Sequence, residues 1–309
     1  MRMRRMAAVA AGGLLATGPA LVGGGALVAS PARLGHPVQP VRGPNGAALR
    51  GPVDQVETTN WSGYAVAHFE TGLTYTSASG TWVVPSVTPP PGYSSGYSSS
   101  WVGVGGFCEN AACSAVDSTL IQLGTEQDAS SSGATYSAWY ELLPSGPVTI
   151  PLTVQSGDTV TASLADGPSV AVHGNAKPGH GGHGGGGGGS GQTWTLSMTV
   201  TQPSGWASTW STTVAYNSSL LSAEWIEEAP VGCIGRYCVQ LPLADYGTAT
   251  FDPGTAAGSS PGLVASDAVV AVNPNGETSN PSAPDSDADG FDTCWGQGTA
   301  LVACSAPTS

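Results

Sequence analysis

The residues that decide the fold are Thr193-Trp194-Thr195-Leu196-Ser197-Met198-Thr199-Val200-Thr201, which alternate without a break between hydroxyl-bearing and apolar side chains. Successive side chains of a β-strand point to opposite faces of a sheet, so one face of this segment is apolar and the other polar. Residues 159–164 repeat the alternation. Both segments therefore predict strands that cover a core with one face and meet water with the other.

Further short alternating runs follow one another after residue 56, separated by Gly, Pro, Ser and Asn. They are residues 61–69, 81–84, 101–104, 119–123, 136–142, 223–227 and 263–272. No long segment has the period of an amphipathic helix. Many short strands between turn residues predict an all-β fold, a sandwich or a barrel.

The N-terminal region differs from the rest in composition. Residues 1–32 have an arginine-rich start, an apolar run and small residues suited to cleavage, which is the order of a secretory signal peptide. A membrane anchor is the alternative, but Gly and Pro within the run favour a signal and an extracellular protein. Residues 33–55 are rich in Pro, Gly and Arg and predict an unstructured propeptide or linker. Residues 56–309 suffice for one β domain, with a Gly/His-rich loop insertion at 173–192.

The charge is distributed unevenly. The chain of 309 residues has 8 Lys and Arg against 21 Asp and Glu, and only Lys177 and Arg236 among the cations lie after Arg50. A domain with so many acidic and so few basic residues is not expected to bind nucleic acid or a membrane. Carboxylates lose their charge in acid, and a domain with two cations then repels itself little, so the composition favours work at low pH. Adaptation to high salt is the alternative reading.

Six cysteines fall into three pairs close in sequence, namely Cys108 with Cys113, Cys233 with Cys238, and Cys294 with Cys304. Six cysteines allow fifteen pairings, of which pairing between sequence neighbours is the simplest. No C-x-x-C occurs, so zinc is a poor alternative. Two other segments could suggest a metal: His180 and His183 in the glycine tract, and residues 285–290, which imitate half of a calcium loop. We interpret them as a flexible loop and an acidic turn, and expect no metal and no cofactor.

Several catalytic motifs can be set aside. The chain has no H-E-x-x-H and neither Asp-Thr-Gly nor Asp-Ser-Gly, which excludes a zincin and a paired-aspartate protease. Gly92-Tyr93-Ser94-Ser95-Gly96 matches G-x-S-x-G in form, but it lies in a loop rather than at a strand-to-helix elbow. Polar residues among aromatic ones on the predicted strands remain: Gln122, Glu141 and Glu224. Because residues two apart share a face, Trp139 lies with Glu141, and Ile226 with Glu224.

These segments resemble the glutamic peptidases, the eqolisin family. The resemblance rests on residues 60–64 (NWSGY), 80–85 (GTWVVP), 101–103 (WVG), 121–124 (IQLG), 136–141 (YSAWYE) and 223–227 (AEWIE), which occur in the order of the family. It implies an antiparallel β-sandwich of two sheets, of the lectin or jelly-roll kind, with a substrate groove on a concave face. The Gly/Ala-rich composition and short prosegment favour a bacterial member.

The resemblance also implies roles for single residues. Gln122 and Glu224 take the places of the catalytic Gln and Glu, and Trp61, Trp101, Trp139 and Glu141 those of groove residues that bind substrate. The three cysteine pairs resemble hairpin staples of the family. The chain departs from the fungal pattern at Gly105 and Ser137, where an Asp is usual. These departures concern the hydrogen bonding around the two catalytic residues.

The implied chemistry fits an acidic medium. A carboxyl group with a pKa of about 4.3 can still act as a base where a histidine is locked in its charged form. Glu224 would take a proton from a water and return it to the leaving amine, while the amide of Gln122 would stabilise the oxyanion. We expect a monomeric, pepstatin-insensitive endopeptidase with protein substrates. Arg33, Arg42 and Arg50 suggest a basic prosegment that pairs with an acidic groove near neutral pH.

Two other functions remain open at this point. A glycoside hydrolase on a similar sandwich would need two carboxyl groups around the scissile bond, and Glu141 with Glu224 could supply them. A non-catalytic binding module would use the tryptophans as a ligand platform. Gln122 has no necessary part in either.

Overall fold

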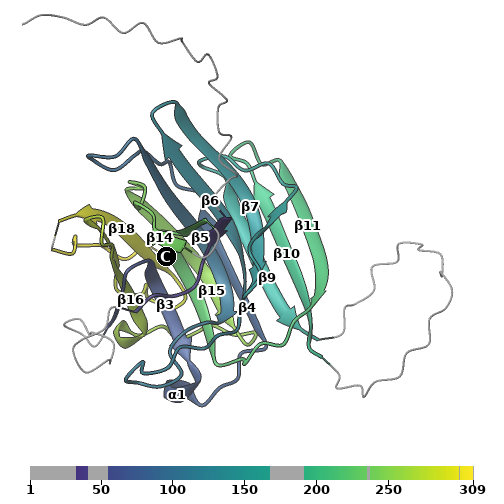
Figure 1. Cartoon of the computed structure of the whole chain (residues 1–309). Coiled ribbons are helices and arrows are strands. Elements are labelled where there is room, and N and C mark those ends of the chain that lie inside the picture. Colours follow the sequence, from purple (N-terminus) through teal and green to yellow (C-terminus); the bar gives the residue numbers. More distant parts are fainter. Residues whose placement is uncertain (1–32, 41–54, 168–190, 235–236, 299, 309) are drawn as a thin grey trace, which may run out of the picture. The chain divides into compact units, whose positions relative to one another are not determined.

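The computed structural model describes residues 33–40, 55–167, 191–234, 237–298 and 300–308 (Figure 1). Within these residues the regular secondary structure is almost entirely strand, apart from α1 (His68–Thr71) and a 3-10 turn η1 (Ala265–Asp267). The strands of the first half are β1 (Arg33–Gly35), β2 (Val56–Thr58), β3 (Trp61–Ala67), β4 (Ser77–Val83), β5 (Ser95–Gly105), β6 (Leu120–Ser130), β7 (Gly133–Leu142), β8 (Val148–Ile150) and β9 (Thr159–Asp166). Those of the second half are β10 (Thr193–Thr201), β11 (Ala207–Ala215), β12 (Ser222–Glu228), β13 (Val231–Ile234), β14 (Tyr237–Gln240), β15 (Thr248–Ala256), β16 (Ala268–Val272), β17 (Glu277–Pro281) and β18 (Phe291–Gln297).

Most strands belong to one hydrogen-bonded path that folds over on itself. Its order is β11-β10-β9-β4-β15-β18-β17-β16-β3-β12-β5-β6-β7-β8, with β2 beside β16. Strands β4 and β9 from the first part of the path contact β5, β6 and β12 from the second part. The predicted sandwich is confirmed, and its two layers join through β18 and β17 into a nearly closed sheet. A separate sheet of three strands has the order β1-β13-β14.

The core between the layers confirms the alternation read from the sequence. Strand β10 has the bounds predicted for it, and its apolar side chains Trp194, Leu196 and Met198 are fully buried. Trp82 and Trp225 belong to the same cluster and come from strands of the two layers. Burying one such large side chain contributes about 1.5–3 kcal/mol to the free energy of unfolding. Because Trp225 of β12 points into this core, the alternate residues of β12 point to the opposite face of the sheet.

A second apolar cluster lies on the other face of the layer that contains β3, β12, β5, β6 and β7. Its members include Trp61, Trp101, Trp139, Ile226 and Val38. Three of these are tryptophans that the family resemblance assigned to a groove. Val38 comes from residues 33–40, which we call the N-terminal strap. The second cluster therefore combines groove residues with a segment expected to be propeptide.

The N-terminal strap differs from the expectation of an unstructured segment. Its β1 residues pair antiparallel with β13, with Leu34 opposite Gly232. Pro40 forms an isolated bridge with Thr58, just before β3. The strap belongs to the same compact unit as the rest of the β domain, which begins at Ala32. The predicted signal at 1–32 and most of the predicted 173–192 insertion lie outside the described residues.

The cysteines pair between sequence neighbours. Disulfides join Cys108 to Cys113, Cys233 to Cys238 and Cys294 to Cys304. The second of them links paired positions of β13 and β14. Among the described residues, no helix has the length and apolarity needed to cross a membrane.

Candidate active site

The candidate catalytic residues lie in one row across four neighbouring strands. Glu224 of β12 is opposite Gly103 of β5, Gly103 is opposite Gln122 of β6, and Gln122 is opposite Glu141 of β7. Directly paired residues of adjacent strands point to the same face of a sheet. We call these four residues the site row. The pairing thus brings together three of the polar residues singled out in the sequence, which are far apart along the chain.

Gly103 leaves a gap in the middle of the site row. A Cβ atom at this position would lie 3.0 Å from the ring of Trp101 and 3.2 Å from Cβ of Gln122. Glu224 and Gln122 are therefore two strand spacings apart, roughly 10 Å between Cα atoms, and position 103 between them has no side chain of its own. The ring of Trp101 lies next to this gap, and Gln122 and Glu224 are both buried.

The side chain of Gln122 is oriented by Glu141. Its Nε2 donates a hydrogen bond of 2.8 Å to Oε2 of Glu141, and both side chains are buried. The Oε1 atom of Gln122 has no hydrogen-bond partner among the described residues, and neither carboxyl oxygen of Glu224 has one. Buried polar atoms normally have hydrogen-bond partners, and these three oxygens can each accept a further hydrogen bond.

Burial dominates the electrostatics of the site row. It raises the pKa of Glu224 well above 4.5, the hydroxyl of Ser222 offsets a part of this, and the charge of Asp117 adds to the rise. Burial also raises the pKa of Glu141 to about 7, against the opposing effects of His36 and of the hydrogen bond from Gln122. Desolvation disfavours the ionised form of a carboxyl group, so both acids hold their protons above their ordinary range.

The tryptophans form the next row along the same face. Trp101 lies opposite Ile226 on β12 and Gly124 on β6, and Gly124 in turn lies opposite Trp139. The rings of Trp61 and Trp101 meet edge to face, with centroids 4.7 Å apart. All three tryptophans are buried in this structure. As substrate-binding residues they would have to be uncovered first.

Glu228 belongs to this face but was not predicted. It is fully buried, and its Oε2 accepts a hydrogen bond of 2.8 Å from Nε1 of Trp101. Its Oε1 accepts one of 2.9 Å from Nδ2 of Asn60. Glu228 lies four residues after Glu224 on one strand, and that period of two was the signal that could have found it. Burial raises the pKa of Glu228 well above 4.5.

The structure accounts for glycine at position 105. The backbone turns there with φ of 86°, and a Cβ atom would lie 2.4 Å from the carbonyl oxygen of Thr119 and 3.0 Å from Oδ2 of Asp117. Only glycine suits such a place. The space that a side chain of residue 105 would enter is filled by the carboxyl group of Asp117, which comes from a loop.

Asp117 accepts hydrogen bonds from three segments of the chain. It accepts hydrogen bonds from the backbone N–H of Gly106 at 3.2 Å, from the N–H of Thr119 at 2.9 Å, and from the hydroxyl of Ser219. The third contact reaches the residues that lead into β12. A charge at Asp117 is therefore held near Glu224 by contacts that the sequence pattern did not reveal.

Ser137, the second departure from the fungal pattern, faces a carboxyl group as well. It lies opposite Glu126 across β6 and β7. Glu126 is buried, and burial with the charge of Asp128 raises its pKa well above 4.5. Position 137 carries no acidic side chain in this chain, but Glu126 at the paired position of the neighbouring strand β6 does.

A cavity of about 480 Å³ opens beside the site row. Its lining includes Gly35, Pro37 and Val38 of the strap, Gly106 and Asp117, Glu141, and residues 143–146. Glu141 is the member of the site row that reaches this cavity.

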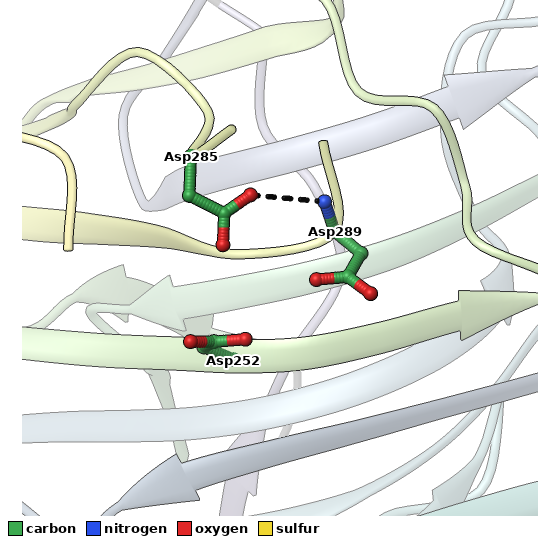
Figure 2. A group of neighbouring side chains, drawn as sticks. All are labelled: Asp252, Asp285 and Asp289. Carbon is green, nitrogen blue, oxygen red and sulfur yellow. Dashed lines mark hydrogen bonds between the residues drawn. The ribbon is translucent and has the colours of Figure 1, made fainter. Parts of the chain in front are cut away.

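A separate acidic group lies away from the site row. Figure 2 shows Asp252, Asp285 and Asp289, whose oxygens lie within 4.8 Å of one another. Asp285 Oδ1 accepts hydrogen bonds of 3.2 Å from the backbone N–H groups of Asp289 and Gly290. These bonds close the tight turn of residues 285–290. Burial and the neighbouring carboxylates raise the pKa of Asp252 and of Asp289.

Comparisons with known proteins concern the family and the fold of the chain. Residues 59–171 match the model of the Peptidase A4 family. A crystal structure of scytalido-glutamic peptidase with a transition state analog inhibitor has a TM-score of 0.51 at 22% identity, over 77% of this chain and 98% of that one. The crystal structure of aspergilloglutamic peptidase from Aspergillus niger has a TM-score of 0.40 at 18% identity, over 65% and 99%. No curated protein matches the chain.

Gln122 and Glu141 lie inside the segment that matches the family, and Glu224 lies beyond it. The likeness in fold covers most of the β domain as well as that segment. Residues 59–171 are thus similar to the Peptidase A4 family, and the fold of the chain is similar to that of scytalido-glutamic peptidase.

Proposed function

We propose that this protein is a secreted endopeptidase of acidic media in which Glu224 activates water and Gln122 stabilises the oxyanion. The observation that carries the proposal is the site row, where a buried glutamate and a buried glutamine flank the gap at Gly103. Both residues present oxygens without partners. A water molecule or the N–H of a peptide group in the gap would donate the hydrogen bonds that these oxygens can accept.

The reaction needs only these two side chains and a water molecule. The carboxylate of Glu224 takes a proton from the water, whose oxygen attacks the scissile carbonyl carbon. Negative charge then develops on the carbonyl oxygen, which accepts a hydrogen bond from Nε2 of Gln122. Glu224 returns the proton to the amide nitrogen, the C–N bond breaks, and an acid and an amine leave.

Gln122 can donate a hydrogen bond to the oxyanion because a hydrogen bond to Glu141 already fixes the orientation of its Nε2 atom. The bond to Glu141 holds Nε2 toward β7 and leaves the second N–H of the same nitrogen for the substrate. Glu141 can accept that bond whether or not it carries a proton. One such donor lowers the barrier by about 2.7–4 kcal/mol, and its strength does not vary over the acid range because an amide does not titrate.

The raised pKa of Glu224 bears on the working pH. A smaller fraction of this glutamate is ionised in acid than of an exposed one, but the ionised form is a stronger base. Activity on the acid side is expected to rise with pH as Glu224 loses its proton. The near-absence of cations in the domain keeps the fold free of positive self-repulsion over the same range.

The remaining parts of the proposal concern the whole chain. Residues 1–32 are the signal peptide, 33–55 the propeptide and 56–309 the catalytic domain with its loop insertion at 173–192. The disulfides support export, since such bonds persist in oxidising compartments. The enzyme works as a monomer on protein substrates. It resists pepstatin, because the paired-aspartate motifs are absent from the sequence.

The geometry disfavours a glycoside hydrolase. Glu224 and Glu141 stand at the two ends of the site row, three strand spacings apart, which is roughly 14 Å between Cα atoms. Gln122 also occupies the place between them.

The test is digestion of a protein substrate between pH 2 and 5 with purified full-length chain in the presence of pepstatin. Glu224→Gln and Gln122→Ala are expected to lose activity. Glu227→Gln is the matched control, because Glu227 is buried on the same strand but bonds to Ser100 and lies off the site row. Full activity in either site variant would refute the proposed pair.

A further inference from the structure

The N-terminal strap crosses the face that carries the site row. One end is held by the pairing of β1 with β13, and the other by a bond of 2.8 Å from the N–H of Thr59 to the carbonyl oxygen of Gln39. Between these ends the strap runs past Trp139, Glu141 and Glu228. It touches two of the strands, β7 and β12, that build the candidate active site.

His36 is the residue of the strap that enters this face. Its ring stacks on the indole of Trp139, with centroids 4.1 Å apart and planes 5° from parallel. Its Nδ1 lies 3.2 Å from Oε2 of Glu228. The side chain is 1% exposed, so the stack and the polar contact are both shielded from water.

The backbone of the strap is also held by hydrogen bonds. The N–H of His36 donates to Glu141, the residue that orients Gln122. Asn60 makes two bonds to the strap: its Nδ2 donates to the carbonyl oxygen of Pro37 at 2.9 Å, and its Oδ1 accepts from the N–H of Gln39 at 3.0 Å. Through Glu141 the strap is therefore one hydrogen bond away from Gln122.

The side chains of the strap alternate as they do in an extended peptide bound to a groove. His36 and Val38 are buried, whereas Pro37 between them is exposed. Recognition of extended peptides combines main-chain hydrogen bonds with pockets for alternate side chains. Pro37 and Pro40 restrict the backbone, which lowers the entropy lost on binding.

We propose that residues 35–40 are an internal ligand of the active-site groove. In this proposal Trp139 and Glu228 form a subsite for a flat imidazole or aromatic side chain, which the chain fills with its own His36. The proposal rests on the proposed function, because it takes the face of the site row as the substrate groove. A peptide substrate can then engage the groove only after the strap has left.

This contact differs from the basic prosegment expected from the sequence. Arg42 and Arg50 lie outside the described residues, and so does the side chain of Arg33. Burial lowers the pKa of His36 to about 4 although Glu141 and Asp128 face it, so the ring is neutral near pH 7. The described contacts of the strap are therefore stacking and hydrogen bonds, made by a histidine that is neutral near pH 7.

The first experiment observes the strap without relying on catalysis. The full chain carrying Glu224→Gln is isotope-labelled, and the ring protons of His36 are assigned by their loss in Glu224→Gln/His36→Ala. Stacking on Trp139 is expected to move these protons upfield, and the ring is expected to stay neutral down to about pH 4. Unshifted ring protons with an ordinary pKa near 6.5 would overturn the proposal.

The second experiment asks whether the subsite accepts the same sequence from outside. The probe is acetyl-Gly-His-Pro-Val-Gln-Pro-amide, and a peptide with alanine in place of the histidine is its control. The probe is expected to bind the His36→Ala chain at least tenfold more tightly than the unaltered chain, whose subsite is filled. Equal binding to both chains, or equal binding of both peptides, would overturn the proposal.

The matched control variant is Gln39→Ala. The hydrogen bonds of Gln39 to Thr59 and Asn60 come from its backbone, so this variant is expected to behave as the unaltered chain in both experiments. Initial rates of peptide hydrolysis are expected to rise at least tenfold in His36→Ala and to stay unchanged in Gln39→Ala. A docked His36 in the unaltered chain, together with no peptide hydrolysis by the His36→Ala chain, would contradict the proposed function and leave the proposal about the strap intact. An undocked His36 in an active peptidase would do the reverse.

Discussion

Gln122 and Glu141 face each other across β6 and β7 and share a hydrogen bond of 2.8 Å between Nε2 and Oε2. This contact decides which end of the Gln122 amide points toward β7. In the structure the amide nitrogen of Gln122 donates this bond and a carboxyl oxygen of Glu141 accepts it. Glu141 is therefore a positioning residue for the proposed oxyanion donor.

Replacing Glu141 by glutamine is expected to lower kcat/KM about tenfold, since a second amide can face Gln122 with either end and no longer fixes the orientation of Nε2. The loss should appear mainly in kcat, because the donor acts on the developing oxyanion. Steady-state kinetics with a peptide substrate measure it. An unchanged kcat, with an unchanged melting temperature, would show that the contact does not matter for the reaction.

Replacing Gly103 by alanine is expected to abolish most activity. The new Cβ would stand 3.0 Å from the Trp101 ring and 3.2 Å from Cβ of Gln122, in the gap where the substrate is proposed to lie. Gly191→Ala is a control outside the site row, with its closest atom at 3.4 Å. If Gly103→Ala kept both its fold by circular dichroism and its full kcat, the gap would not be the reaction site.

The protein is expected to be more stable at pH 4.5 than at pH 7.5. The pKa of Glu141 and that of Glu227 are raised to about 7 by burial, and those of Glu126, Glu224 and Glu228 are also raised. A raised pKa means that the folded state binds more protons than the unfolded state between the two pKa values. The stabilisation is complete below about 4.5 and is lost as pH rises through 7.

His36 acts in the opposite sense, because its lowered pKa costs stability as pH falls from 6.5 to about 4. The several carboxyl groups outweigh it. We expect the free energy of unfolding to be larger at pH 4.5 by on the order of 5 kcal/mol. Urea denaturation at the two pH values measures the difference, and a chain more stable at pH 7.5 would contradict this account of the buried acids.

Replacing Asp117 by asparagine is expected to move the acid limb of the pH profile of kcat/KM to lower pH. The charge of Asp117 adds to the raised pKa of Glu224, so its removal lets Glu224 ionise in stronger acid. The shift in the limb separates this electrostatic effect from mere loosening of the loop, which would lower the rate without moving the limb. An unmoved limb would show that Asp117 serves only to hold residues 106, 119 and 219 together.

The strands and the face of each residue could be predicted from the sequence because both depend on local alternation. Trp139 with Glu141, and Glu224 with Ile226, share the face predicted for them, while Trp225 points into the core between the layers. The disulfide pairs are also local, and each joins cysteines ten residues apart or fewer.

The remainder of the site depends on register and on loops, which alternation does not determine. The place of Gly103 between Glu224 and Gln122 follows from how β5 pairs with both neighbours. Asp117 reaches the site from a loop, and Asp252 joins Asp285 and Asp289 from a distant strand. The strap lacks any apolar period, so its contacts through His36 could not be read from its composition.

The most direct test of the account compares kcat for a peptide substrate in Glu224→Gln and Glu227→Gln, measured side by side at the pH optimum of the unaltered chain. Both variants replace one buried glutamate of β12 by its isostere, but only Glu224 lies in the site row. We expect a loss of at least a thousandfold in Glu224→Gln and a rate within a few-fold of the unaltered chain in Glu227→Gln. Comparable rates in the two variants would contradict it.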